Sequence, residues 1–194
     1  LDQEQGNNVI LTIDIQLQKF IVEAMGKQKG SVVLMRPQTG EILAMVSQPS
    51  FNLSSTYEEP AEESLLNKAS HGQYSPGSIM KVVTAAAALE SMDEIQEYTV
   101  ECRGVTEFDG VVITCSGGEA HGEVNLSRAM EVSCNAYFAK LSQEMGWKEL
   151  KRTAEAFGFN KDFVFSDIKT TKSRLPVSRQ TDAEELAWSG VGQG

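Results

Sequence analysis

The sequence YSPGSIMK, residues 74–81, runs directly into the apolar, alanine-rich sequence VVTAAAAL, residues 82–89. This apolar run predicts a buried helix that begins near Ser78. Ser78 and Lys81 are three residues apart, so they share a face of that helix and their side chains can meet. A serine hydroxyl becomes a nucleophile beside a base, and a lysine whose charged form is disfavoured can serve as that base. The stretch therefore predicts a nucleophilic serine on a central helix.

The residues just before Ser78 favour this interpretation. Ser75 is a suitable N-cap, Pro76 is a suitable first helical residue, and Gly77 leaves the backbone beside Ser78 uncrowded. Backbone N–H groups at the start of a helix can hold a developing oxyanion. Serine and lysine at this spacing also occur on ordinary amphipathic helices, so the flanking Pro-Gly and the apolar run carry the argument.

A second motif, Ser133-Cys134-Asn135, lies between two apolar helical stretches. Ser133 and Asn135 are two residues apart, and a short turn can point both polar side chains into one cleft. Taken alone, the same residues are typical of a helix boundary, where serine and asparagine bond to the backbone. The motif gains weight because it occurs together with the serine and lysine of the first motif.

Together these motifs resemble the penicillin-binding protein transpeptidases, in the superfamily of active-site serine DD-peptidases and serine β-lactamases. The resemblance extends over most of the chain and keeps the family's order of motifs. It is carried by NVILTID with a following LQ (8–14, 17–18), GEILAMVSQPSF (40–51), NKA (67–69), YSPGSIMK (74–81), HG (121–122) before the Ser-x-Asn motif, and GVGQG (190–194).

The resemblance implies an α+β fold of the β-lactamase/transpeptidase type, in which helices flank an antiparallel sheet. Residues 1–194 would form the N-terminal and central part of such a domain. The family's third motif, Lys-Thr/Ser-Gly, follows the GQG segment, and the C-terminal strands that carry it are expected to be missing from this chain. The sequence Lys169-Thr170-Thr171 is no substitute, because it lacks the glycine and precedes the GQG segment.

The resemblance also implies a mechanism. Ser78 would attack the carbonyl between two D-alanines of a peptidoglycan stem peptide, with Lys81 as its base. Ser133 would pass a proton to the leaving amine, and Asn135 would hold the substrate amide and help to position Lys81. Gly192 and Gln193 are expected to contribute to substrate binding.

The expected function is therefore that of a peptidoglycan DD-transpeptidase that works through a serine acyl-enzyme and is acylated by β-lactam antibiotics. It would need no cofactor and no metal, and its partners would be stem peptides, β-lactams and other cell-wall synthesis proteins. A membrane anchor upstream of this chain would hold it at the extracytoplasmic face of the bacterial membrane. The alternatives are a non-catalytic β-lactam sensor or cell-wall scaffold and a serine β-lactamase, although no glutamate is identifiable as the base that a β-lactamase needs for deacylation.

Composition indicates a globular domain that does not bind nucleic acid. The chain of 194 residues is 41% hydrophobic, which is enough for one core. Its formal net charge of −10 argues against nucleic-acid binding and against direct binding to an anionic membrane surface.

The three cysteines are Cys102, Cys115 and Cys134. Cys102 and Cys115 flank a predicted hairpin, and they could either form a disulfide, worth about 3 kcal/mol, or pack as reduced thiols. Paired Cys-x-x-Cys spacing is absent and the two histidines are isolated in the sequence, so no zinc site is expected. His121, beside Gly122, is expected to fix a turn rather than to take part in chemistry.

The order of predicted elements is mixed. The Asp109-Gly110 pair predicts the turn of the small hairpin, and residues 37–40 predict the turn of a longer one. Helices are expected over 16–25, 78–89, 127–130, 136–145, 148–157 and 183–189, and strands over 9–12, 31–35 and 41–46, with a small β region over 98–115.

Overall fold

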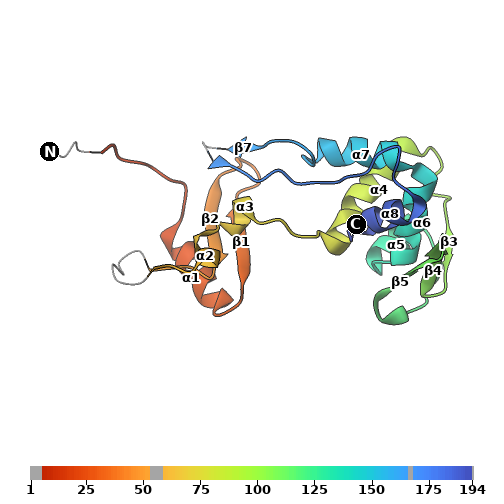
Figure 1. Cartoon of the computed structure of the whole chain (residues 1–194), viewed down its shortest axis with the longest axis horizontal. Coiled ribbons are helices and arrows are strands. Elements are labelled where there is room, and N and C mark those ends of the chain that lie inside the picture. The colour runs from red at the N-terminus through yellow and green to blue at the C-terminus, as the bar shows by residue number, and fades with distance from the viewer. Residues whose placement is uncertain (1–5, 53–58, 166–167, 194) are drawn as a thin grey trace. The chain divides into compact units, whose positions relative to one another are not determined.

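The computed structural model describes residues 6–52, 59–165 and 168–193. Its elements form two compact units, which are described separately. Unit 1 consists of Leu1–Gln73 and Ile168–Thr171, and unit 2 of Tyr74–Asp167 and Lys172–Gly194. Helices and antiparallel strand pairs occur along the chain, which confirms the predicted α+β class (Figure 1).

Unit 1 is built on an antiparallel hairpin, at the position that the sequence predicts. Strands β1 and β2 pair with Val32 opposite Val46 and Leu34 opposite Ala44. The side-chain amide of Gln18 fastens the first helix to β2, because it donates to the Met45 carbonyl at 2.7 Å and accepts from the Met45 N–H at 2.9 Å. The elements of this unit are α1 (Ile15–Met25), β1 (Gly30–Met35), β2 (Ile42–Gln48), α2 (Glu62–Leu65), α3 (Lys68–His71) and β8 (Ile168–Lys169).

The strand predicted over residues 9–12 is wrong. Residues 6–14 have no strand structure, and Val9, Ile10 and Leu11 are 81%, 96% and 69% exposed. A strand needs a neighbour for its backbone groups. In the described part of the chain this segment bonds to β2 only near its end, where the Thr12 hydroxyl donates to the Ile42 carbonyl and the Asp14 N–H donates to the Leu43 carbonyl at 2.8 Å. The apolar run therefore lacks the pairing that would make it a strand.

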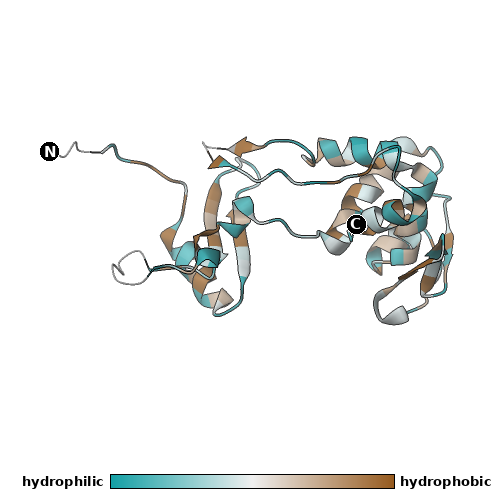
Figure 2. Ribbon diagram, viewed as in Figure 1, coloured by the Kyte–Doolittle hydropathy of each residue, from teal (hydrophilic) through white to brown (hydrophobic). Residues whose placement is uncertain are grey.

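Unit 2 is a packed group of helices. The helix α4 lies against α7, and α6 lies against both α8 and α4. Figure 2 shows many hydrophilic residues on α7, whereas α4 is mostly apolar, as expected for an inner helix. The helical elements are η1 (Gly77–Ile79, a 3-10 turn), α4 (Met80–Ser91), α5 (Leu126–Glu131), α6 (Asn135–Met145), α7 (Trp147–Ala156) and α8 (Ala183–Val191).

The contact between α6 and α8 is unusually close. A Cβ at Gly190 would lie 2.6 Å from the side chain of Ser142, so only glycine lets the two backbones approach in this way. The Ser142 hydroxyl donates to the Ala139 carbonyl at 2.8 Å. The apolar core of this unit surrounds α6, whose Tyr137, Phe138 and Leu141 are fully buried.

The predicted small β region forms two strand pairs in unit 2. Strands β4 (Val105–Phe108) and β5 (Val111–Thr114) make the predicted hairpin, in which Phe108 faces Val111. The turn residues Asp109 and Gly110 both have positive φ angles, 47° and 88°, as a two-residue hairpin turn requires. Strand β3 (Val100–Cys102) pairs with β6 (Gly122–Val124), and the unit also contains η2 (Ser116–Gly118) and β7 (Val164–Phe165).

Among the residues that the structure describes, no helix combines the length and the apolar character needed to cross a lipid bilayer.

Candidate active site

Ser78 lies in a 3-10 turn, and Lys81 lies one turn later, in the first turn of α4. The helix start differs from the prediction. Gly77 has φ +56°, which interrupts a helix beginning at Pro76, and Ser75 does not cap it. Instead, the Ser75 hydroxyl donates to the Gly192 carbonyl at 2.7 Å. Ser75 therefore attaches the nucleophile's turn to the end of α8.

Lys81 lies at the centre of a polar cluster that it forms with Ser78, Ser133 and Asn135. Although it is a lysine, it is only 1% exposed. Its Nζ lies 3.2 Å from Ser78 Oγ, 2.9 Å from Ser133 Oγ and 2.7 Å from the Ser133 carbonyl oxygen. A fourth partner, Asn135 Oδ1, lies at 2.6 Å. The predicted meeting of Ser78 and Lys81 is confirmed, and Ser133 and Asn135 join them.

Opposing effects act on the charge of Lys81. Burial lowers its pKa from 10.5, whereas the nearby thiols of Cys115 and Cys134 act to raise it. Its Nζ also lies 5.8 Å from the centre of the Phe138 ring, a contact that favours the charged form. The net effect is a lowered pKa, as the proposed role of a general base requires.

Ser133 lies in a strained turn that ends α5. The Cys134 N–H donates to the Ala129 carbonyl at 2.8 Å and the Ser133 N–H to the Met130 carbonyl at 3.2 Å. This is the Schellman arrangement, in which the residue at the position of Ser133 is usually glycine. Ser133 has φ +52°, a conformation that few non-glycine residues adopt. The turn points its hydroxyl at Ser78 Oγ, 3.1 Å away.

Asn135 is the first residue of α6, and both ends of its amide are bonded. Its Oδ1 accepts from Lys81, and its Nδ2 donates to the Thr114 carbonyl oxygen at 2.7 Å. The amide orientation is therefore fixed by one donor and one acceptor. Thr114 could not have been found from the sequence, because it contributes a backbone carbonyl and not its side chain.

Gly192 and Gln193 lie at the end of α8 and differ in exposure. Gly192 is buried, and its carbonyl oxygen accepts from the Gly77 N–H at 2.9 Å. Gln193 is exposed, and with Trp188 it lines a cavity of about 280 Å³. Gly192 thus holds the start of the Ser78 turn, and a substrate-binding role for either residue stays a prediction.

The cysteines and His121 form a second cluster directly behind the Ser133 turn. Cys102 Sγ lies 3.4 Å from His121 Nδ1, so His121 is not isolated as the sequence suggested. All three cysteines are free thiols, which corresponds to the reduced alternative for Cys102 and Cys115. Burial raises the pKa of Cys134 to about 12. Burial also acts to raise the pKa of Cys102, but hydrogen bonds from His121 and Gly104 outweigh it, and the pKa of Cys102 falls to about 7.

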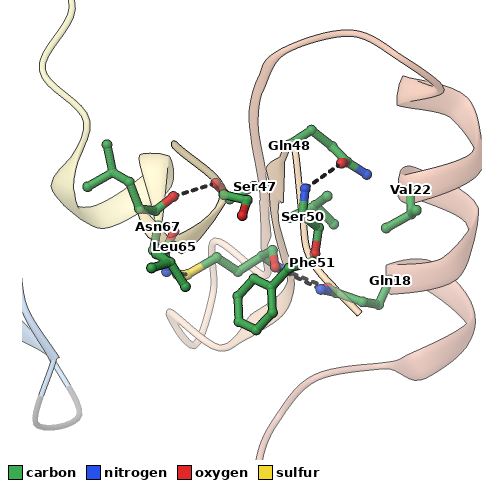
Figure 3. Close-up of a pocket in the computed structure, with 12 residues that line it drawn as sticks. Gln18, Val22, Ser47, Gln48, Ser50, Phe51, Leu65 and Asn67 are labelled. Carbon is green, nitrogen blue, oxygen red and sulfur yellow. Dashed lines mark hydrogen bonds between the residues drawn. The ribbon is translucent and has the colours of Figure 1, made fainter. Parts of the chain in front are cut away.

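Unit 1 contains a separate pocket of about 290 Å³ (Figure 3). Gln18 and Val22 of α1 line one side of it, and Phe51, Leu65 and Asn67 line the other. None of the described residues that line this pocket has an ionisable side chain. The pocket therefore offers no acid or base.

Known proteins resemble this chain over most of its length. The family model of the penicillin binding protein transpeptidase domain matches residues 30–192. The peptidoglycan D,D-transpeptidase PbpA of Mycolicibacterium smegmatis is 34% identical to the chain over 97% of its length, and the match covers 43% of PbpA. The peptidoglycan D,D-transpeptidase MrdA of Escherichia coli K12 is 28% identical over 98% of the chain and 34% of MrdA.

Solved structures give the same result. A D,D-transpeptidase domain of a peptidoglycan glycosyltransferase from Eggerthella lenta superposes with a TM-score of 0.86 and 34% identity, over 96% of this chain and 47% of that one. Penicillin-binding protein A from M. tuberculosis, as a penicillin G acyl-enzyme complex, superposes with a TM-score of 0.86 and 29% identity, over 98% of this chain and 48% of that one. The transpeptidase-like fold is thereby confirmed, and the chain spans less than half the length of these relatives.

Proposed function

Because this chain belongs to the family of penicillin-binding protein transpeptidase domains, we propose that it carries the nucleophile and the proton-transfer groups of a peptidoglycan D,D-transpeptidase. One observation supports this most strongly. The buried Nζ of Lys81 lies within hydrogen-bonding distance of two serine hydroxyls, those of Ser78 and Ser133. A buried amine between two hydroxyls can take a proton from one and pass it through the other.

In the first step, neutral Lys81 removes the proton of Ser78 Oγ as this oxygen attacks the carbonyl carbon between two D-alanines. The carbonyl oxygen becomes an oxyanion, for which we assign the backbone N–H of Ser78 as one donor. The first N–H groups of a helix have no intrahelical partner, so they suit this role. Lys81 is then an ammonium that keeps Asn135 Oδ1 and the Ser133 carbonyl oxygen as acceptors.

In the second step, the tetrahedral adduct collapses and the C–N bond to the terminal D-alanine breaks. Ser133 lies 3.1 Å from Ser78 Oγ and 2.9 Å from Lys81 Nζ, so its hydroxyl can give a proton to the leaving amine and take one from Lys81. The product is an ester of Ser78. An amine from a neighbouring stem peptide attacks this ester by the reverse proton path, and the cross-link forms.

A β-lactam has a strained amide that resembles the scissile bond, so the same serine would open it and remain acylated. A relative in this family has been solved as a penicillin G acyl-enzyme, which supports this outcome for Ser78. A serine β-lactamase also needs a base for deacylation. The hydrogen bonds that the structure describes for Ser78, Lys81 and Ser133 include no carboxylate, which favours the transpeptidase.

The proposed setting follows from the substrate. Peptidoglycan lies outside the bacterial membrane, so we place this domain at the extracytoplasmic face, held by an anchor in another part of the protein. Stem peptides and β-lactams would be its ligands, and other cell-wall synthesis proteins its neighbours. Asn135 and Gln193 would contact the substrate peptide, and Gly192 would hold the Ser78 turn beside it.

The test is the intact mass of the full protein that carries this chain, with and without penicillin G. We expect one covalent adduct per molecule, lost in Ser78→Ala. Ser91→Ala is the matched control, because Ser91 ends α4, the helix that follows the Ser78 turn, and its hydroxyl donates to the Ala87 carbonyl at 2.8 Å. Adducts in Ser78→Ala, or no adduct and no penicillin turnover in the native protein, would overturn the proposal.

A further inference from the structure

A cavity of about 280 Å³ lies along one face of α8, the dark-blue helix of Figure 1. The helix contributes Glu184, Glu185, Trp188 and Ser189 to its lining. Their spacing of three or four residues places these side chains next to one another on the helix surface. Residues 176–177, a proline and a valine, line the cavity as well. The chemistry proposed for the active site uses none of these residues.

Ser189 brings a buried hydroxyl to this cavity. The residue is only 4% exposed. Serines within helices commonly donate to a carbonyl of the preceding turn, as the hydroxyls of Ser91 and Ser142 do at 2.8 Å. Among the hydrogen bonds of the described residues, none involves the Ser189 hydroxyl. Every fully covered side-chain oxygen of the described residues has a partner, so the Ser189 oxygen keeps an opening, and the cavity that it lines provides one.

The lining of the cavity is negatively charged. Glu184 is half-buried and Glu185 is exposed. Neither carboxylate takes part in any ion pair that the described residues form. None of the described residues that line the cavity is a lysine, an arginine or a histidine. Partial burial weakens screening by water, so Glu184 attracts a cation more strongly than a fully exposed carboxylate would.

Trp188 gives the cavity a second means of recognising a cation. An aromatic ring attracts an ammonium group that lies over its face, and tryptophan does so best. The half-buried indole and residues 176–177 also offer apolar surface to an alkyl chain. An ammonium group has three donors and no acceptor, and the two carboxylates and the Ser189 oxygen are all acceptors. The lining therefore matches an alkylammonium group and not an anion.

We propose that this cavity binds the alkylammonium side chain of a peptidoglycan stem peptide, an inference that rests on the proposed function. The cross-link is made by an amine of a stem peptide, so the peptide that acylates Ser78, being of the same kind, carries such an amine too. The Gly192 carbonyl accepts from the Gly77 N–H at 2.9 Å, and Ser189 lies three residues before Gly192 on α8. The path from Ser189 to Ser78 is therefore roughly 10 Å, which two extended residues and a long side chain can span.

Stabilisation of the helix dipole is the competing explanation for the acids. Glu184 and Glu185 lie in the first turn of α8, where carboxylates interact favourably with the positive end of the helix. That effect accounts for the two carboxylates, but it does not account for the buried hydroxyl of Ser189 or for the indole beside it. A water molecule in the cavity would also serve the hydroxyl. It would give no preference for an amine over an alkyl chain.

The first test compares two donor substrates of the full protein, Nα-acetyl-lysyl-D-alanyl-D-lactate and the same peptide with norleucine, which lacks the amine. Release of D-lactate gives kcat/KM for each. In the native protein we expect kcat/KM to be at least tenfold higher for the lysine peptide, and in Glu184→Gln we expect this ratio to fall below threefold. Glu155→Gln is the matched control and should keep the native ratio. Glu155 is also half-buried, but it lies on α7 and pairs with Lys151 at 4.0 Å.

Ser189→Ala provides a readout that a structural role would not give. A hydroxyl without a partner contributes nothing to folding, so this variant should melt at a temperature no lower than the native protein. Its ratio of kcat/KM for the lysine and norleucine peptides should fall at least threefold, because the ammonium group loses an acceptor. A lower melting temperature with an unchanged ratio would show that the hydroxyl is structural, and would overturn its role in the cavity.

Binding to Ser78→Ala separates the cavity from the chemistry. By titration calorimetry this variant should bind the lysine peptide with a Kd at least fivefold below that of the norleucine peptide. A ratio below two in both turnover and binding, in a protein that penicillin G acylates, would overturn the cavity and leave the proposed function standing. A preference for lysine in binding, without acylation of the native protein by penicillin G, would support the cavity and overturn the proposed function.

Discussion

Replacing Gly192 by alanine tests how firmly the end of α8 holds the nucleophile's turn. Gly192 has φ +83° and ψ +28°, in the left-handed region. A Cβ there would lie 2.0 Å from the Gly77 carbonyl oxygen and 2.7 Å from the Met80 Cβ. The first neighbour is backbone and cannot rotate away. Gly192→Ala must therefore push α8 away from the turn that carries Ser78.

The expected loss of stability can be worked out from these contacts. The left-handed conformation costs alanine about 1–2 kcal/mol, and overpacking adds about 1–3 kcal/mol. The Gly192 carbonyl also accepts from the Gly77 N–H at 2.9 Å and the Ser75 hydroxyl at 2.7 Å, and weakening each bond costs about 1 kcal/mol. Alanine also restricts the unfolded chain, which offsets about 0.5–1 kcal/mol, so we expect the free energy of unfolding to fall by about 3–6 kcal/mol.

Gly117→Ala is the matched control. Gly117 has φ +65° and ψ +7°, and a Cβ there would have no atom within 4 Å. Gly117→Ala places alanine in the left-handed conformation without a steric clash, so its free energy of unfolding should fall by about 1 kcal/mol. The difference between the two variants isolates the contact between Gly192 and the Ser78 turn.

Two measurements on the full protein decide the outcome. Urea unfolding gives the stability of each variant, and stopped-flow fluorescence with a fluorescent penicillin gives the rate of acylation. Displacing Ser78 by about 1 Å can cost about 100-fold in rate, so Gly192→Ala should acylate at least tenfold more slowly. Equal stability of the two variants, with acylation at the native rate in both, would refute the reasoning.

Three further results are expected. Burial lowers the pKa of Lys81 from 10.5, so the rate of penicillin acylation, measured by stopped flow, should rise with pH and level off below pH 10.5. A rate that does not change with pH would contradict the role of Lys81 as the base. Stability should also rise with pH. Between the pKa of Lys81 in the folded chain and its pKa in the unfolded chain, the unfolded chain binds more protons, so the contribution of Lys81 to the free energy of unfolding increases as pH rises. Leu150→Ala, at a fully buried position, should cost about 2–5 kcal/mol in urea unfolding, while Leu89→Ala, at a position 54% exposed, should cost less than about 1 kcal/mol. Glu90→Gln removes the charge that pairs with Arg152 at 3.6 Å, while the glutamine oxygen can still accept from the Thr153 hydroxyl, so calorimetry should find a change below about 1 kcal/mol, and a larger loss would contradict a screened surface pair.

The features that local sequence determines were predictable. The three-residue spacing of Ser78 and Lys81 fixes their contact once the segment is helical, and their atoms lie 3.2 Å apart. The Asp109-Gly110 turn was predictable because few residue pairs adopt two positive φ angles. In both cases the information lies within a few residues of the feature itself.

The features that depend on distant partners were not predictable from one sequence. Ser75 has the residue type of an N-cap, but its hydroxyl bonds to Gly192, 117 residues away. His121 meets Cys102 only because β3 pairs with β6, which the spacing of the cysteines does not reveal. The apolar residues near Ile10 read as a strand, but a strand exists only where a neighbour pairs with it.

Ser133 shows how this chain balances stability against chemistry. It occupies the position after α5 at which glycine is the favoured residue, so Ser133→Gly would relieve about 1 kcal/mol of backbone strain. The same change would remove the hydroxyl that lies between Ser78 Oγ and Lys81 Nζ. A search for thermostable variants would therefore select the substitution that abolishes the proton relay, and stabilisation of this domain has to come from residues outside the turn.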